Sequence, residues 1–263
     1  MKSRRILALI GIAVASLMLV IGLPLLTTPS LAQSNNTLLI SAAASLKEVM
    51  QEIKTNYQQA KPNVNINYNF GASGALLQQI QQGAPADIFI SAAKKQMDTL
   101  EQTGQLVAGT RSIFAKNRLV LIVPKNAVGI DSLYNFRDSK IKKIAIGEPR
   151  SVPAGQYAEQ VFQKLNIYEQ IKPKLVLANN VRQVLAAVES GNADAGLVYL
   201  TDARISNNIK VLVTADEKYH SPIIYPVAVI KKTKNVQAAK EFTQFLSSNQ
   251  AKAVLQKYGF ILP

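Results

Sequence analysis

Ser41-Ala42-Ala43-Ala44-Ser45-Leu46 is the stretch of this sequence that decides its fold. The apolar residues 38–40 before it predict a buried strand, and apolar side chains at 46, 49, 50, 53 and 57 share one face of a helix after it. Ser45 is therefore expected at or near the helix N-cap, where backbone N–H groups lack partners and carry partial positive charge. Such a junction can hold an anion without a lysine or arginine, although taken alone it is more typical of an ordinary serine cap.

The first 32 residues are expected to be a signal peptide. Lys2, Arg4 and Arg5 form a positive start. Residues 6–26 are almost entirely apolar, and Ser30-Leu31-Ala32 is typical of a cleavage site. We place cleavage after Ala32 and leave open whether the general or the twin-arginine route exports the chain. The alternative is a retained membrane anchor, because the apolar run is nearly long enough to span a bilayer.

The composition narrows the possible chemistry. The 263 residues include no cysteine and one histidine, His220, which argues against disulfides, a lipid-modified cysteine, and metal sites rich in Cys or His. The net charge is +14, and removal of the three basic residues at the start leaves +11. Because the basic residues are dispersed, we expect a solvated surface that weakly attracts anions, not a nucleic-acid partner. We expect the mature chain to be exported, not to span the membrane and to have no cofactor.

The chain alternates predicted strands and helices, a pattern typical of an α/β fold with mostly parallel sheets. Strands are expected at 37–41, 64–70, 87–91, 118–123, 143–147, 174–178, 193–199, 210–214 and 224–231. Helices are expected at 45–60, 75–82, 94–103, 154–165, 181–190, 236–248 and 251–258. The length is sufficient for two compact lobes or one large domain.

Two further strand-to-helix junctions share the small, polar character of the first. Gly71-Ala72-Ser73-Gly74 follows one strand, and Val152-Pro153-Ala154-Gly155 opens another helix, with Pro153 suited to the first turn. In open α/β sheets, ligands bind beyond the carboxyl ends of the strands. Three such junctions, each without a basic residue at its critical point, favour a recessed anion site.

Several motifs together resemble the periplasmic molybdate-binding proteins of molybdate ABC importers, over essentially the whole mature chain. They are Ala42-Ala43-Ala44-Ser45-Leu46, Phe70-Gly71-Ala72-Ser73-Gly74, residues 83–92, residues 152–158, Asn180-Val181-Arg182, Gly196-Leu197-Val198-Tyr199, residues 225–229 and residues 257–260. The resemblance implies an α/β, two-lobed type II periplasmic binding protein fold, with mixed sheets flanked by helices and two hinge strands near 113–119 and 221–225. Lobe one would comprise 33–116 and 224–263, and lobe two 117–223. It also implies a monomer that docks on an inner-membrane ABC permease.

The resemblance further implies that neutral donors alone hold the oxyanion. Ser45 and Ser73 would contribute their hydroxyls and backbone N–H groups, Ala154 and Val181 their backbone N–H groups, and Tyr199 its phenol. Some members carry a serine-rich run where this chain has Ser73 alone. A site without a carboxylate disfavours protonated oxyanions, because their hydrogen would be left unpaired. Molybdate is the expected ligand, and tungstate is nearly the same size; molybdenum would enter as this oxyanion only.

Other functions stay open at this point. The first alternative is a binding protein for a different tetrahedral oxyanion, such as sulfate or thiosulfate. Another is an interaction protein that stays tethered to the membrane. A serine hydrolase is disfavoured because Ala75 stands where the nucleophile elbow requires its second glycine, so we expect no enzyme.

Two charged or titratable residues have no settled role. Arg182 either contacts the anion or pairs with a carboxylate such as Glu189 or Asp194. His220 lies in a polar turn and is expected to be exposed and uninvolved.

Overall fold

The computed structural model describes residues 36–263, so the expected signal peptide and its cleavage site lie outside the described residues. The strands are β1 (Asn36–Ala43), β2 (Val64–Gly71), β3 (Ile88–Ile90), β4 (Ser112–Lys116), β5 (Leu119–Pro124), β6 (Ile144–Gly147), β7 (Leu175–Ala178), β8 (Ala195–Tyr199), β9 (Ile209–Thr214) and β10 (Ile224–Val229). The α-helices are α2 (Lys47–Ala60), α3 (Ser73–Gln81), α4 (Lys94–Gln102), α5 (Pro153–Lys164), α6 (Tyr168–Ile171), α7 (Val181–Glu189), α8 (Leu200–Ala203), α9 (Val236–Phe245) and α10 (Asn249–Lys257). The 3-10 turns are η1 (Ala44–Leu46), η2 (Leu133–Arg137), η3 (Lys172–Lys174) and η4 (Glu217–Tyr219).

Two five-stranded mixed sheets form the centres of two lobes. The first has the strand order β2-β1-β3-β10-β4, and the second has the order β7-β6-β8-β5-β9. In each sheet the first three strands are parallel and the remaining pairings are antiparallel. The α/β, two-lobed fold with mixed sheets is thereby confirmed, and the sheets are less parallel than the alternation of elements predicts.

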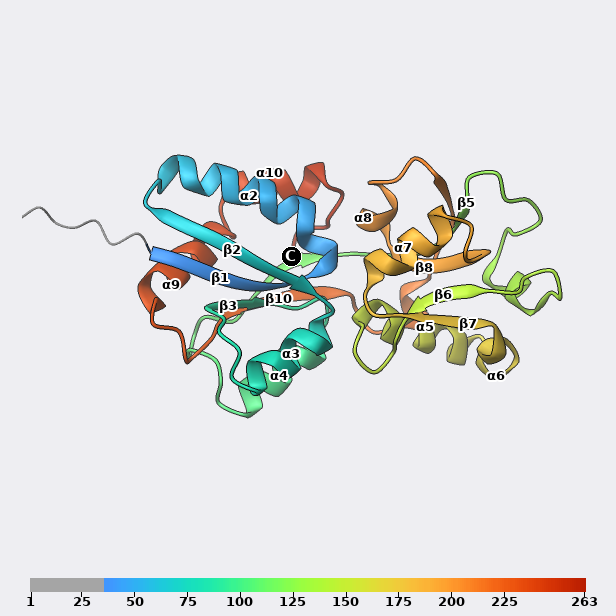
Figure 1. Cartoon of the computed structure of the whole chain (residues 1–263), viewed down its shortest axis with the longest axis horizontal. Coiled ribbons are helices and arrows are strands. Elements are labelled where there is room, and N and C mark those ends of the chain that lie inside the picture. The colour runs from blue at the N-terminus through green and yellow to red at the C-terminus, as the bar shows by residue number, and fades with distance from the viewer. Residues whose placement is uncertain (1–35) are drawn as a thin grey trace, which may run out of the picture. The chain divides into compact units, whose positions relative to one another are not determined.

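Helices cover both faces of each sheet. In the first lobe, α2 and α10 lie together on one face, and α3 and α4 lie on the other (Figure 1). In the second lobe, α7 packs on one face of the sheet and α5 on the other. The buried side of α7 consists of Val181, Val184, Leu185 and Val188, which recur at helical spacing and explain why this segment folds as a helix.

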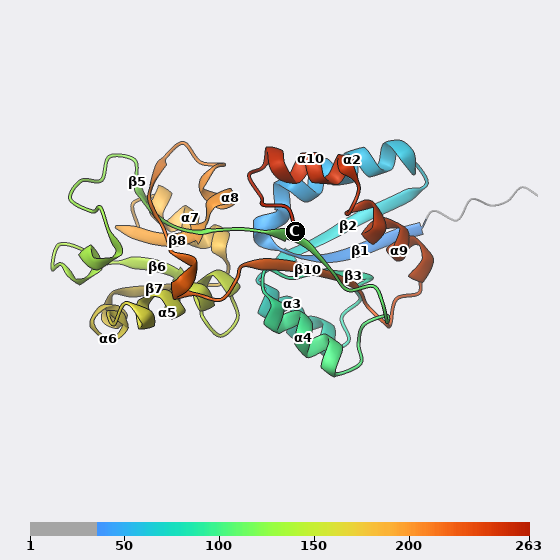
Figure 2. The same cartoon turned by 180° about the vertical axis from the view of Figure 1, so that it is seen from behind.

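Two segments of chain pass between the lobes, as the view from behind shows (Figure 2). One links β4 to β5 through Asn117 and Arg118, and the other leads from β9 back to β10. The backbone N–H of Asn117 donates to the carbonyl of Ile223 at 3.1 Å, which joins the two segments. The expected lobes, 33–116 with 224–263 and 117–223, stay a prediction about which residues move as one body.

Several boundaries differ from those predicted. β4 lies where the first hinge strand is expected, near 113–119, whereas α6 and α8 are additional to the predicted elements. The predicted helix 236–248 is too long, because α9 ends at Phe245 and Ser248 caps the next helix by accepting a hydrogen bond from Ala251 N at 3.2 Å. Of the helices within residues 36–263, none combines the length and apolar character that crossing a bilayer requires.

Candidate functional site

The five residues expected at the site all line one small cavity between the lobes. These are Ser45, Ser73, Ala154, Val181 and Tyr199. Around them lie Ala43, Ala44, Gly71, Ala72, Ala92, Val152, Pro153 and Asn180. The space between the lining atoms is small, about 210 Å³ including the part that is open to solvent. A cavity of this size favours a small ligand over a peptide.

The cavity lies where strands end and helices begin. Its wall includes residues at the carboxyl ends of β1 and β2 in the first lobe and of β8 in the second. The turn η1 and the helices α3, α5 and α7 all start at its wall. The first N–H groups of a helix have no acceptor within that helix and carry partial positive charge. Four such starts, two from each lobe, favour an anion in this space.

Ser45 lies directly before the N-cap of the helix, in agreement with its expected position at or near the cap. It lies inside η1, and the N-cap residue of α2 is Leu46. The reason is that the chain makes a 3-10 turn before the α-helix, which moves the cap one residue onward. The buried Ser45 hydroxyl lies instead 3.0 Å from the hydroxyl of Tyr225, a residue 180 positions away.

Ser73 is the first residue of α3, and its N-cap is Ala72. The Ser73 hydroxyl is fully buried and accepts a hydrogen bond from the backbone N–H of Ala92 at 2.9 Å. This hydrogen bond uses the Ser73 oxygen as an acceptor and leaves the Ser73 proton available to a group in the cavity.

The second lobe contributes two helix starts and a phenol. Pro153 occupies the first turn of α5, as expected, which places the Ala154 amide at the cavity. Asn180 caps α7 by accepting a hydrogen bond from Gln183 N at 3.1 Å, which places Val181 at the helix start. Tyr199 is 1% exposed, and within residues 36–263 its hydroxyl has no hydrogen-bond partner. Burial raises the pKa of Tyr199 well above its ordinary value, so the phenol keeps its proton.

Arg182 lies beside the cavity, but its charge is committed to carboxylates. It pairs with Glu48 of the other lobe, and its Nε lies 2.6 Å from Asp202 Oδ1. Arg182 therefore pairs with carboxylates, as one of the two expectations has it, but its partners are not Glu189 or Asp194. The Asp194 carboxylate accepts instead from the backbone N–H groups at 142 and 143. Burial raises the pKa of Asp202 to about 6, against the opposing effect of the Arg182 charge.

His220 is buried, not exposed as expected. It is 8% exposed, its Nδ1 lies 2.8 Å from the carbonyl oxygen of Ser221, and its ring lies 5.8 Å from that of Tyr157. The segment returning from β9 to β10 folds against α5, which covers the imidazole. His220 does not line the cavity.

The two lobes touch directly around the cavity. The backbone N–H of Gly74 donates to the carbonyl of Ser151 at 2.9 Å, and Arg182 donates to the carbonyl of Ser45 at 3.4 Å. The Tyr157 hydroxyl donates to the carbonyl of Ala92 at 3.4 Å. The structure is therefore closed over the site.

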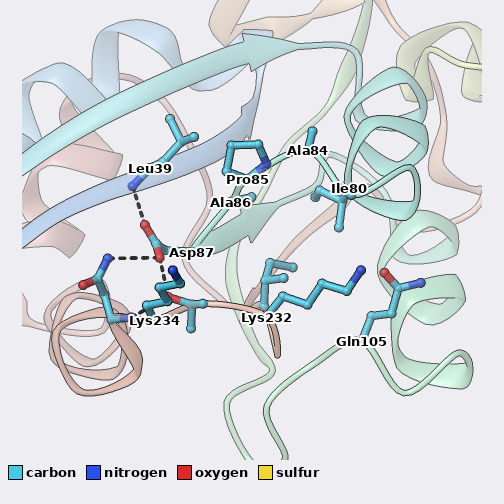
Figure 3. A pocket seen from close by; sticks show the side chains of 13 residues that line it. Leu39, Ile80, Ala84, Pro85, Ala86, Asp87, Gln105, Lys232 and Lys234 are labelled. Carbon is cyan, nitrogen blue, oxygen red and sulfur yellow. Dashed lines mark hydrogen bonds between the residues drawn. The ribbon is translucent and has the colours of Figure 1, made fainter.

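A larger pocket in the first lobe lacks this convergence of donors. It has a volume of about 360 Å³ and lies near the start of β3 (Figure 3). Its carboxylate, Asp87, is occupied by the backbone N–H of Leu39 at 2.7 Å and by Thr233. Asp87 therefore ties the start of β3 to neighbouring segments of the first lobe. Among residues 36–263 there is no cluster of three or more His, Cys, Asp or Glu side chains suited to a metal ion.

Comparison with known proteins places this chain in a family. A family model for bacterial extracellular solute-binding proteins matches residues 38–261. The chain belongs to this family. It is 44% identical over 225 residues to a Bacillus subtilis protein named "Putative ABC transporter substrate-binding lipoprotein YvgL". The match covers 85% of this chain and 86% of that protein. It is 36% identical to the molybdate-binding protein ModA of Haemophilus influenzae, over 84% of this chain and 88% of that one. A solved structure, "substrate binding domain of putative molybdenum ABC transporter from Clostridium difficile", shares 48% identity with a TM-score of 0.68, over 86% of this chain and 99% of that one.

Sequence reasoning missed part of the site. Ala92 and Asn180 line the cavity, and Tyr225 contacts Ser45 from behind. Ala92 could have been found, because a small residue directly after the buried strand β3 repeats the pattern of the first junction. No local pattern in the sequence marks Tyr225 as a neighbour of Ser45.

Proposed function

We propose that this protein binds molybdate, and also tungstate, in the cavity and delivers it to the membrane permease of an ABC importer. The observation that carries the proposal is the convergence of Ser45, Ser73, Ala154, Val181 and Tyr199 from two lobes on a space suited to one small ion. The unpartnered, buried hydroxyl of Tyr199 supports it, because a neutral donor without an acceptor is costly unless a ligand completes it. The relative and the solved structure that are named for molybdate and molybdenum point to the same ligand.

The donor set fits a fully deprotonated tetrahedral oxyanion. Helix starts and hydroxyls supply hydrogen bonds from several directions, while the nearby Arg182 is held by carboxylates. Of the described residues that line the cavity, none carries a carboxylate that could accept the proton of hydrogen phosphate. That proton would stay unpaired, at a cost of about 1–3 kcal/mol. The smaller sulfate ion would have to be rejected by the size of the closed cavity.

The mechanism is capture followed by delivery. The open lobes admit the oxyanion, and closure brings the donors of both lobes together and excludes water. The closed monomer then docks on the permease in the inner membrane. In this account the chain is exported to the periplasm, its signal peptide is removed after Ala32, and it catalyses no reaction and holds no cofactor.

Isothermal titration calorimetry of the protein purified from the periplasm tests the function. We expect tight one-to-one binding of molybdate and tungstate and no binding heat from sulfate or phosphate. Binding of sulfate in preference to molybdate would assign the cavity to another oxyanion, and silence with all four anions would refute an oxyanion site.

A further inference from the structure

Behind the cavity, buried side chains form a chain of hydrogen bonds that ends on Ser45. Asn117 Nδ2 lies 3.3 Å from Tyr225 Oη, and Tyr225 Oη lies 3.0 Å from Ser45 Oγ. Asn117 Nδ2 also lies 2.9 Å from Thr201 Oγ1, at the start of the second lobe's α8. All four residues are buried. Of these residues, only Ser45 has a role in the proposed binding of the oxyanion.

The direction of this chain is fixed at the end away from the cavity. The backbone N–H of Arg118 donates to Asn117 Oδ1 at 2.9 Å, so the amide nitrogen of Asn117 is the atom that faces Tyr225. An amide nitrogen donates and does not accept, so Tyr225 Oη accepts from Asn117. The Tyr225 proton is then available to Ser45 Oγ.

Ser45 Oγ and Tyr225 Oη lie 3.0 Å apart, and either hydroxyl can be the donor. When Tyr225 donates, the Ser45 O–H is free to donate toward the cavity that it lines. Burial raises the pKa of Tyr225 well above its ordinary value, which keeps the donating proton in place. Ser73 has the same arrangement with a different partner, because its oxygen accepts from the Ala92 amide.

We propose that Asn117 and Tyr225 hold the Ser45 hydroxyl as a donor toward the oxyanion, which makes Tyr225 a positioning residue for the ligand. The proposal rests on the proposed function. Both cavity serines then present their protons toward the space that the oxyanion would occupy. The direction in which Ser45 donates is therefore set by residues behind the cavity as well as by those that line it.

A double-mutant cycle tests this chain of hydrogen bonds from Asn117 through Tyr225 to Ser45, which we call the relay. Without the Tyr225 hydroxyl, the Ser45 hydroxyl can rotate among its rotamers, so Tyr225→Phe should weaken molybdate binding by about fivefold. Ser45→Ala should weaken it by about tenfold or more, because a charge-assisted bond is lost. Because Tyr225 acts through Ser45, adding Tyr225→Phe to Ser45→Ala should change the affinity no further. Calorimetry on the four proteins, each purified from the periplasm, measures all corners of the cycle.

Tyr57→Phe is the matched control. Tyr57 is a buried tyrosine of the same lobe, its hydroxyl has no partner among the described residues, and it does not line the cavity. Its substitution should leave the affinity unchanged. Thermal denaturation of each ligand-free variant checks that it is folded.

Each outcome bears on the relay. An equal loss from Tyr225→Phe in both backgrounds would mean that Tyr225 acts on the site through packing and would overturn the proposal, as would an unchanged affinity in Tyr225→Phe alone. Wild-type protein that binds neither molybdate nor tungstate would instead refute the proposed function, and the relay with it, before any variant is measured.

Discussion

At the scale of single residues, the hydroxyl groups that line the cavity are of two kinds. Some have a hydrogen-bond partner within the described protein, and others have none. Ser73 accepts from the Ala92 amide, whereas the Tyr199 hydroxyl has no partner within residues 36–263. The two groups would both donate to the oxyanion. They differ in what the ligand-free protein loses when each is removed.

Ser73→Ala and Tyr199→Phe should therefore separate binding from stability. Each should weaken molybdate binding by about 1–3 kcal/mol, because each removes a donor to a buried anion. Ser73→Ala should also lower the free energy of unfolding of the ligand-free protein by about 1–3 kcal/mol, since the Ala92 N–H loses its acceptor. Tyr199→Phe should leave that free energy unchanged or raise it. Calorimetry and urea denaturation measure the two quantities, and wild-type affinity in either variant would remove that residue from the site.

The buried carboxylate of Asp202 gives a prediction about pH. Burial raises its pKa in the folded protein to about 6 from an ordinary value of 3.8, so the folded state binds a proton in this interval more readily than the unfolded state. The stabilising contribution of Asp202 is thus present below about pH 4 and is lost as the pH rises through 6. Relative to Asp202→Asn, the wild-type free energy of unfolding should fall by about 2–3 kcal/mol over this interval. A difference that stays constant or increases from pH 4 to 6 in urea denaturation would contradict the assignment.

At the scale of elements, the site depends on close approach between the start of α3 and the segment before α5. A Cβ added at Gly74 would lie 2.5 Å from the carbonyl oxygen of Ser151 in the other lobe. Gly74→Ala should hinder closure and weaken molybdate binding by about 1–3 kcal/mol. It should not destabilise the open, ligand-free protein, because alanine favours a helix more than glycine does.

Gly155→Ala provides the contrast for this prediction. Its Cβ would clash with the Gly147 carbonyl inside the second lobe, so this variant should lower the melting temperature of the ligand-free protein. If Gly74→Ala lowers the melting temperature as well and leaves the affinity intact, Gly74 supports the fold and not closure.

The sequence predicts the site residues that lie in local motifs, but not the distant residues that hold them in place. Ser73, Ala154 and Val181 each lie in a short motif at a strand end, so local patterns suffice to place them at helix starts. The resemblance then brings them together. The partners that fix these groups come from distant segments: Tyr225 is 180 positions from Ser45, and Glu48 is 134 from Arg182. Such contacts follow from the packing of two lobes, which no local periodicity encodes.

At the scale of the whole molecule, the lobes are joined by a charge pair beside the cavity. Arg182 of the second lobe pairs with Glu48 of the first, and both side chains are partly shielded from solvent. Glu48→Gln should weaken molybdate binding by about 1 kcal/mol, mainly through faster release, because it removes a charge pair that joins the two lobes beside the cavity. Stopped-flow displacement of molybdate measures the release rate.

Glu52→Gln is the matched control for this pair. Glu52 lies one turn further along α2 and pairs with Lys257 at 2.7 Å inside the first lobe. Glu52→Gln makes the same change of charge and leaves the contact between the lobes intact. The release rate of molybdate should therefore stay at the wild-type value. Equal effects from the two substitutions would mean that overall charge, and not the contact between lobes, governs release.

The central claim, that donors from both lobes hold one molybdate ion, is tested most directly by a crystal structure of the protein with molybdate, using anomalous scattering at the molybdenum edge. We predict one molybdenum peak in the cavity, with its oxygens within hydrogen-bond distance of Ser45, Ser73, Ala154, Val181 and Tyr199. A peak elsewhere on the molecule, or an empty cavity at saturating molybdate, would contradict the account.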